Sequence, residues 1–205
     1  MTHFRNLKLA GATALAAISM VFGAGAAEWR GWNIHVEDYP VSIAMESFMS
    51  EVTEKTNGEL TGTVFHAGVL GDQPDAIEQT RLGIMDFGVF SLGPMGQAVP
   101  ETNVVSLPFI FKSIDQMHRL MDGEVGAEID KGLQAKGIVA LGWYDAGARS
   151  FYNSQKPINT PEDVAGMKIR VMSNDLFVGM VEAMGGNATP MAFGEVYQSL
   201  QTGVV

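Results

Sequence analysis

Two arginines, Arg149 and Arg170, are the residues of this sequence best suited to bind a small molecule. Arg170 lies in the segment GMKIRVM, where apolar and basic side chains alternate in the period-2 pattern of a half-buried strand. Arg149 lies in GWYDAGARSFYNS, which is rich in aromatic residues. A guanidinium among apolar neighbours needs an anion, and a carboxylate satisfies it through charged hydrogen bonds of about 1.5 to 3 kcal/mol each. The two arginines therefore predict a carboxylate site, unless both simply face solvent, as most single arginines do.

Other reactive side chains form no recognisable motif. The sequence has no cysteine, and its four histidines, at positions 3, 35, 66 and 118, are far apart, so we expect no metal site. Phosphate-binding loops of the GxGxxG kind and the GxSxG nucleophile motif do not occur, and we expect no cofactor. Carboxylates brought together by the fold remain an alternative, so a secreted enzyme acting on a small anionic substrate stays open.

The first 26 residues have the layout of a secretory signal peptide. Arg5 and Lys8 precede an apolar run over residues 9–22, and the small-residue stretch GAGAAE follows. The run is shorter than the ~20 residues of a membrane-spanning helix. We therefore expect cleavage near Ala26 and a periplasmic location.

The charge of the chain excludes some classes of partner. The formal net charge is −10, and loss of two positive charges with the signal peptide would make it −12. Such a surface repels nucleic acid and anionic membranes. It does not exclude a small anion, because distant charges are screened and a local arginine dominates.

The order of predicted elements in the first half favours an α/β fold with a parallel sheet. Hydrophobic periodicity, caps and turn residues predict strands and helices in alternation. The predicted strands cover residues 29–36, 60–65 and 84–91, and the helices between them cover residues 40–56 and 73–83.

The second half predicts further helices and strands, with a boundary between two domains near residues 145–150. We assign residues 27–147 to a first α/β domain and residues 148–205 to the beginning of a second. Val204 and Val205 are expected to start a further strand, which indicates a piece of a longer α/β protein. Helices are predicted over residues 113–122, 124–136, 160–166, 174–184 and 193–203, and extended segments over residues 138–145, 148–154 and 166–172.

Four long segments resemble one family throughout the mature chain. VLGDQPDAIEQTRLGIMDF, VVSLPFIFKS, GARSFYNSQKPINTPEDVAGMKIRVM and TPMAFGEVYQSLQTGVV are similar to the solute-binding receptors of tripartite ATP-independent periplasmic (TRAP) transporters, of the dicarboxylate-receptor type. The resemblance implies an α/β, two-domain periplasmic binding protein of class II-like fold, with the ligand cleft between its domains. It also implies that the C-terminal part is absent from this chain.

The resemblance further implies roles for particular residues. Arg170 would form a salt bridge with a ligand carboxylate, and Arg149 matches a second arginine of many members. Phe193 would pack on the ligand, while Asp72 and Ser173 match polar contacts of other members. Such a receptor delivers its ligand to a TRAP membrane permease and is expected to be a monomer when complete.

Three more positions bear on the ligand. Some acidic-sugar receptors of the family carry a glutamate where this sequence has Ser91, so their ligand is not assumed here. Asn33 and His35 are expected to face the cleft and favour a hydroxylated acid. The sequence leaves dicarboxylates, hydroxy or oxo acids and sugar acids open.

Overall fold

The structure, a computed structural model, describes residues 27–205, and the predicted signal peptide lies outside these residues. Its first half has the expected alternation of strands and helices, and the three strands pair in parallel in the order β2-β1-β3. The prediction of a parallel α/β sheet is therefore confirmed. These elements are β1 (Ala27–Trp32), α1 (Pro40–Lys55), β2 (Leu60–Phe65), α2 (Gln73–Arg81) and β3 (Phe87–Gly88).

Helix α1 shows how local sequence sets an element and its buried face. Pro40 stands in its first turn, and the chain leaves the helix through Asn57 and Gly58, whose φ angles are 51° and 81°. Its apolar periodicity predicts a buried face of Val41, Ala44, Met45, Phe48 and Val52. The buried residues are Ser42, Met45 and Met49, so Met45 is common to both sets and the face is turned by about one position. Ser42 is drawn inward because Asn33 donates a hydrogen bond to its hydroxyl at 2.8 Å.

A helical layer follows the sheet. Ser113 caps α4 by accepting a hydrogen bond from Gln116 N at 3.1 Å, as the sequence predicts. The layer consists of α3 (Leu92–Met95), η1 (Pro100–Ser106), α4 (Ile114–Met121) and α5 (Glu124–Gln134). Its core of buried side chains, which α2 shares, is Ile77, Met95, Val99, Met121, Ile129 and Leu133. We call residues 27–137 the amino-terminal unit.

A second, smaller unit has its own core of Val171, Phe177 and Val181. We call residues 161–203 the carboxy-terminal unit. Its strands β4 and β5 pair in parallel, and Arg170 stands opposite Thr189. The sequence analysis missed β5, since it is short and ends in a proline. The elements are η2 (Pro161–Val164), β4 (Lys168–Val171), α6 (Asp175–Ala183), β5 (Asn187–Pro190) and α7 (Phe193–Thr202).

Three predicted strands differ from the structure. Of residues 84–91 only β3 pairs, because β1 ends at Trp32 and offers it only two partner residues. Residues 138–145 and 148–154 belong to no sheet within the described chain, since no strand there lies beside them. They form an extended connection over residues 138–160, which we call the crossing segment.

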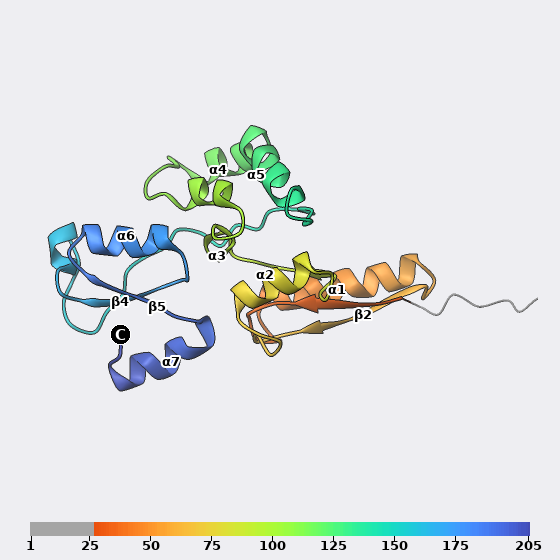
Figure 1. Cartoon of the computed structure of the whole chain (residues 1–205), viewed down its shortest axis with the longest axis horizontal. Helices are drawn as coiled ribbons and strands as arrows, with labels where there is room; N and C mark the ends of the chain where they lie inside the picture. The colour runs from red at the N-terminus through yellow and green to blue at the C-terminus, as the bar shows by residue number, and fades with distance from the viewer. Residues whose placement is uncertain (1–26) are drawn as a thin grey trace, which may run out of the picture.

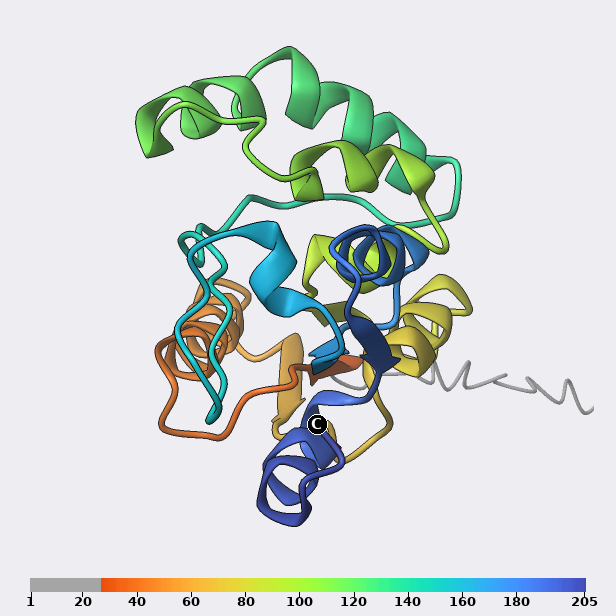
Figure 2. The same ribbon diagram turned by 90° about the vertical axis from the view of Figure 1, so that its left-hand side faces the viewer.

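Figures 1 and 2 show how these parts lie together. Helix α3 occupies the middle, where the sheet with α1 and α2, the helices α4 and α5, and the carboxy-terminal unit meet. The crossing segment runs from α5 past α3 to the carboxy-terminal unit. Among residues 27–205, no helix is long and apolar enough to cross a membrane.

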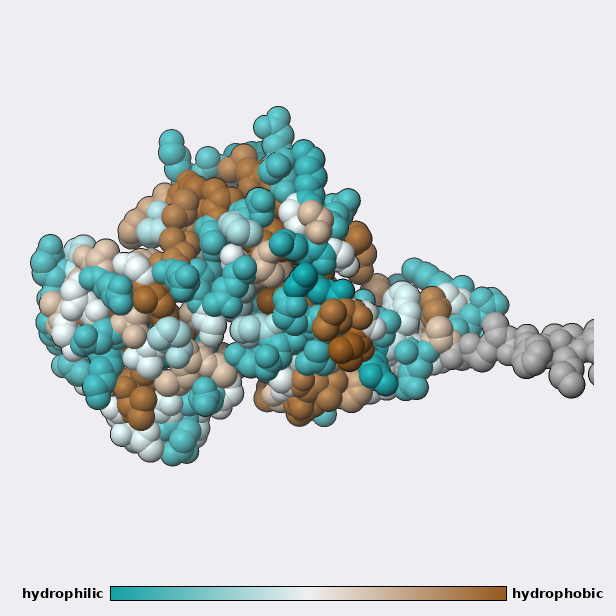
Figure 3. All heavy atoms as spheres, in the orientation of Figure 1, coloured by the Kyte–Doolittle hydropathy of each residue, from teal (hydrophilic) through white to brown (hydrophobic). Residues whose placement is uncertain are grey.

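Large apolar side chains are exposed at many positions between residues 27 and 205, and one group of them lies in and beside the loop before α4. Figure 3 shows them gathered over the region of α4 and the loop before it. Phe109, in that loop, is 100% exposed, and Ile110 and Ile114 are partly exposed beside it in sequence. Phe109 and Ile110 belong to the segment VVSLPFIFKS, in which Pro108 interrupts an apolar run.

Candidate functional site

A large open cleft separates the two units. Its volume is about 3110 Å³, well above the ~300–1,000 Å³ of a typical small-molecule site. The β1–α1 loop and the end of β3 line one side, while β4, α6 and the start of α7 line the other. The crossing segment contributes as well. Five of the eight predicted site residues line this cleft, namely His35, Ser91, Arg149, Arg170 and Phe193.

Arg170 is held by the strand next to its own. It projects from β4, and its Nε and Nη2 atoms donate to the carbonyl oxygen of Met191, at 3.1 and 2.7 Å, just after β5 ends. Both bonds use one edge of the guanidinium, which leaves the other N–H groups for a ligand. Burial lowers the pKa of Arg170, a nearby Asp72 and Tyr152 raise it, and Arg149 lowers it.

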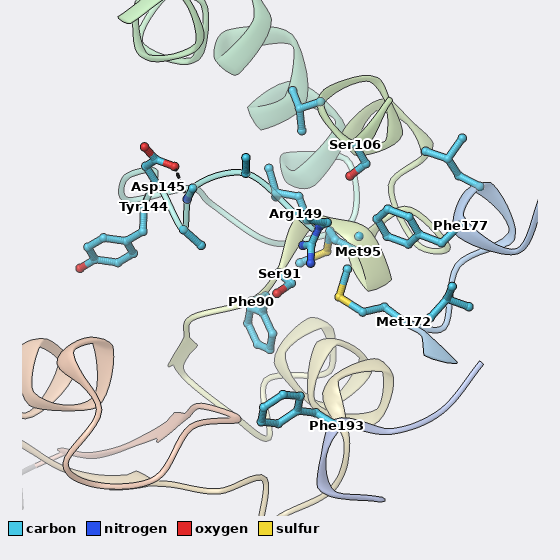
Figure 4. A pocket seen from close by; sticks show the side chains of 18 of the residues that line it. Phe90, Ser91, Met95, Ser106, Tyr144, Asp145, Arg149, Met172, Phe177 and Phe193 are labelled. Atoms are coloured by element: carbon cyan, nitrogen blue, oxygen red, sulfur yellow. Dashed lines mark hydrogen bonds between the residues drawn. The ribbon is translucent and has the colours of Figure 1, made fainter. Parts of the chain in front are cut away.

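Arg149 reaches the same cleft from the crossing segment. Its guanidinium carbon lies 5.5 Å from the centroid of the buried Phe177 ring, in a cation–π arrangement. Figure 4 shows the side chain extending into the space shared by Ser91, Met172 and Phe177. Desolvation by burial lowers the pKa of Arg149. The cation is therefore held against an apolar surface rather than free in water.

Neither arginine forms a salt bridge with a carboxylate within residues 27–205. The positive charge of Arg149 contributes to the lowered pKa of Arg170. An anion placed between them would offset this repulsion and satisfy the remaining donors. The arrangement is thus suited to a carboxylate.

Aromatic side chains form a second feature of the cleft. The His35 ring stacks on Tyr39, with centroids 4.1 Å apart and planes inclined by 20°. The ring of Phe193, at the start of α7, meets His35 edge-on at 6.0 Å and 73°. Partial burial lowers the pKa of His35, so its neutral form is favoured. These three rings join the two units across the cleft.

The remaining predicted residues lie elsewhere in this conformation. Asn33 does not face the cleft as expected, because it is completely buried and its amide bonds to His35 N, Ser42 and His66. Its role here is to hold the loop that carries His35. Asp72 and Ser173 do not line the cleft, although Asp72 is close enough to raise the pKa of Arg170. Ser91 lines it and is exposed.

Sequence reasoning missed three cleft residues, Phe90, Tyr152 and Met172. Phe90 stacks on the buried Trp32 with ring centroids 5.2 Å apart. The sequence predicts Phe90 as part of a buried strand, and nothing in its type or spacing indicates a binding residue. Tyr152, which is close enough to raise the pKa of Arg170, lies in the same aromatic-rich segment as Arg149. Met172 directly follows β4.

The α/β sheet, the carboxy-terminal unit and the arginine-lined cleft together define the architecture of periplasmic solute-binding proteins. A family model described as "Bacterial extracellular solute-binding protein, family 7" matches residues 33–205. The chain belongs to this family of solute-binding receptors, as its resemblance to the TRAP receptors implies.

Individual relatives agree with this assignment. A "Solute-binding protein" of Chromohalobacter salexigens is 58% identical over 191 residues, which is 93% of this chain and 57% of the relative. The "C4-dicarboxylate-binding periplasmic protein DctP" of Rhodobacter capsulatus is 33% identical and matches 96% of this chain. That match covers 60% of the relative, so the chain spans less than two thirds of either protein.

Solved structures of TRAP periplasmic solute-binding proteins are similar as well. One from Sulfitobacter sp. NAS-14.1, with bound β-D-galacturonate, is 81% identical with a TM-score of 0.85, over 87% of this chain and 59% of that one. One from Roseobacter denitrificans, with bound β-D-glucuronate, is 61% identical with a TM-score of 0.84, over the same shares.

Proposed function

We propose that this chain is the ligand-recognising part of a periplasmic TRAP receptor for a sugar acid of the hexuronate type. Arg170 and Arg149 bind the ligand carboxylate, and the receptor delivers the ligand to a TRAP membrane permease. The receptor acts without chemical turnover and is secreted by a cleaved signal peptide. The observation that carries this proposal is the pair of guanidinium groups in one cleft, with no carboxylate partner within residues 27–205.

The geometry of Arg170 supports its role as the main clamp. The carbonyl of Met191 fixes the guanidinium from one side, which reduces the rotamer freedom that binding would otherwise remove. A carboxylate can then accept a pair of parallel hydrogen bonds from the free edge. Arg149, which stacks on Phe177 of α6, supplies a second positive charge to the same cleft.

The choice of a sugar acid rests on the cleft wall and on the relatives. His35, Tyr39 and Phe193 present ring faces and edges, which suit the C–H face of a pyranose, while Ser91 offers a hydroxyl. Two similar structures bind galacturonate and glucuronate. Ser91 in place of a glutamate argued against assuming this ligand, and the relatives now favour it.

We also propose that the two units are the lobes of the receptor. The boundary predicted at residues 147 and 148 falls within the crossing segment, which has no regular structure of its own. Ligand contacts from both sides would favour a closed state, because each lobe contributes part of the site.

Isothermal titration of the full-length protein with D-galacturonate, D-glucuronate and succinate tests the proposal. We expect the two uronates to bind and Arg170→Ala to weaken binding by at least tenfold, since one charged hydrogen bond contributes about 1.5 to 3 kcal/mol. The concentration of each acid should stay constant during incubation with the protein, which would show that no turnover occurs.

Arg119→Ala is the matched control for this experiment. Arg119 is an exposed arginine of α4 that does not line the cleft, so its loss removes the same charge without touching the site. Equal affinities for wild type and Arg170→Ala would refute the clamp. Succinate binding without uronate binding would assign the receptor to dicarboxylates instead.

A further inference from the structure

Asn174 joins the two units at a point that does not line the cleft. Its side chain is 3% exposed and caps α6 by accepting a hydrogen bond from Leu176 N at 2.7 Å. Its Nδ2 atom, however, turns to the other unit. There it donates to the carbonyl of Gly93 in α3 and to Oδ1 of Asn103 in η1, the latter at 2.7 Å. One amide thus starts a helix and ties it to the amino-terminal unit.

Two glycines of the amino-terminal unit make this close approach feasible. A Cβ atom on Gly93 would lie 2.7 Å from Cε2 of Phe177, and one on Gly96 would lie 2.7 Å from Nδ2 of Asn174. Real Cβ atoms do not approach other atoms so closely. The backbone around α3 can therefore approach α6 this closely only because Gly93 and Gly96 have no side chains.

The same contact is connected to both arginines. Phe177 packs on Gly93 and at the same time carries the guanidinium of Arg149. Met172, which also approaches Gly93, stands two residues after Arg170 at the end of β4. A shift of α6 against α3 would therefore move both cationic groups relative to the cleft wall that the amino-terminal unit contributes.

We propose that Asn174 is a positioning residue and that its bonds to Gly93 and Asn103 form the fulcrum about which the two units close. It sets ligand affinity without touching the ligand. The affinity part of this inference rests on the proposed receptor function, whereas the part about the orientation of the units does not.

Asn174→Asp isolates the contact between units. The aspartate keeps the length and the capping oxygen, so α6 still begins correctly. It replaces the amide donor by an oxygen that faces the Gly93 carbonyl and Asn103, and a buried polar group without its partner is unfavourable. Asn174→Ser keeps a capping hydroxyl, introduces no charge and is too short to reach α3, so it serves if the aspartate variant fails to fold.

Asn187→Asp is the matched control. Asn187 is an exposed residue at the start of β5, and its Nδ2 donates to the carbonyl of Gly166 at 3.1 Å, within the carboxy-terminal unit. The substitution therefore makes the same chemical and charge change in the same unit. It leaves the contact with α3 intact.

The first measurement follows the distance between the units in the ligand-free, full-length protein. The present sequence contains no cysteine, so Glu54→Cys in α1 and Glu182→Cys in α6 give unique, exposed positions for a pair of spin labels. We expect a broader distance distribution in Asn174→Asp and Asn174→Ser, and an unchanged one in Asn187→Asp. A folded Asn174→Ser protein with the wild-type distribution would overturn the inference.

The second measurement is the affinity for D-galacturonate. We expect the dissociation constant to rise about tenfold in both Asn174 variants, mainly through faster dissociation, and to stay within about twofold in the control. Arg170→Ala should instead lose affinity without altering the label distances. If the wild type binds none of the acids, the proposed receptor function fails, while the label distances still decide the role of Asn174. Unchanged affinity in a folded Asn174 variant would overturn its link to binding.

Discussion

At the scale of single residues, the two arginines explain why the cleft favours an anion. Arg149 disfavours the protonated form of Arg170, and partial desolvation disfavours it further. A carboxylate beside the guanidinium groups would offset both effects, because opposite charge nearby favours the ionised guanidinium. An uncharged sugar of the same shape would not offset them.

His35 gives this protein a predicted dependence of stability on pH. Its pKa lies below the ordinary 6.5 because burial disfavours the charged imidazolium. The unfolded chain therefore binds a proton at a higher pH than the folded one does. The free energy of unfolding should be highest above about pH 6.5 and should fall as the pH drops towards the pKa of the folded state.

Urea unfolding of wild type and His35→Gln between about pH 8 and about pH 5 measures this effect. We expect the wild type to lose more stability on acidification than the variant, since glutamine cannot take up the proton. If the free energies of unfolding of the two proteins changed equally with pH, burial would not lower the pKa of His35.

The arrangement around Asn33 illustrates what sequence reasoning can predict about a site residue. The position after β1 correctly suggested a residue near the cleft, and His35 indeed lines it. The direction of the Asn33 side chain could not be predicted, because it depends on Ser42 from α1 and His66 from the end of β2. Hydrogen bonds to residues distant in sequence therefore direct the Asn33 side chain towards the core.

At the scale of elements, two helical glycines should respond in opposite ways to alanine. A Cβ atom on Gly126 in α5 would overlap the carbonyl oxygen of Met121 at the end of α4. Gly126→Ala should therefore separate the two helices and lower the free energy of unfolding by about 1 to 3 kcal/mol. A Cβ atom on Gly179 in α6 meets nothing within 4 Å, so Gly179→Ala should raise it by about 0.5 to 1 kcal/mol.

Urea unfolding measures both changes, and the opposite signs serve as a mutual control. If both variants gained stability, helix propensity alone would govern these positions, and the close packing of α4 on α5 would not hold. A loss in Gly179→Ala would show that the space around Gly179 is not open.

The accuracy of the predicted elements follows from how local their signals are. The cap at Ser113 and the glycine that ends α7 could be predicted because each acts within a few residues. For α6 the sequence offered Ser173 or Asn174 as the cap, and Asn174 is the one that the structure uses. The strands expected over residues 138–154 were not found, since a strand needs a partner that local sequence does not supply. Strand β5 was missed because its own sequence, NATP, has no strand pattern. It is a strand only because it pairs with β4.

At the scale of the whole molecule, the cleft is too open to hold a monosaccharide acid tightly in this conformation. Its volume of about 3110 Å³ exceeds the ~300–1,000 Å³ of typical sites, in which most of the ligand surface is buried. The sequence could indicate which residues carry the chemistry. It could not give the distance between them across the cleft, because that distance depends on how the two units are oriented.

A ligand that contacts both units should therefore close them. We expect D-galacturonate to reduce the radius of gyration of the full-length protein in small-angle X-ray scattering, because only a closed state lets Arg170 and Arg149 bind the same carboxylate while His35 and Phe193 cover the ring. Arg170→Ala at the same ligand concentration should stay open, and Arg119→Ala should close like the wild type. A radius that stays unchanged while titration shows saturation would mean that the ligand binds to one unit alone, and His35 of the amino-terminal unit would then have no part in recognition.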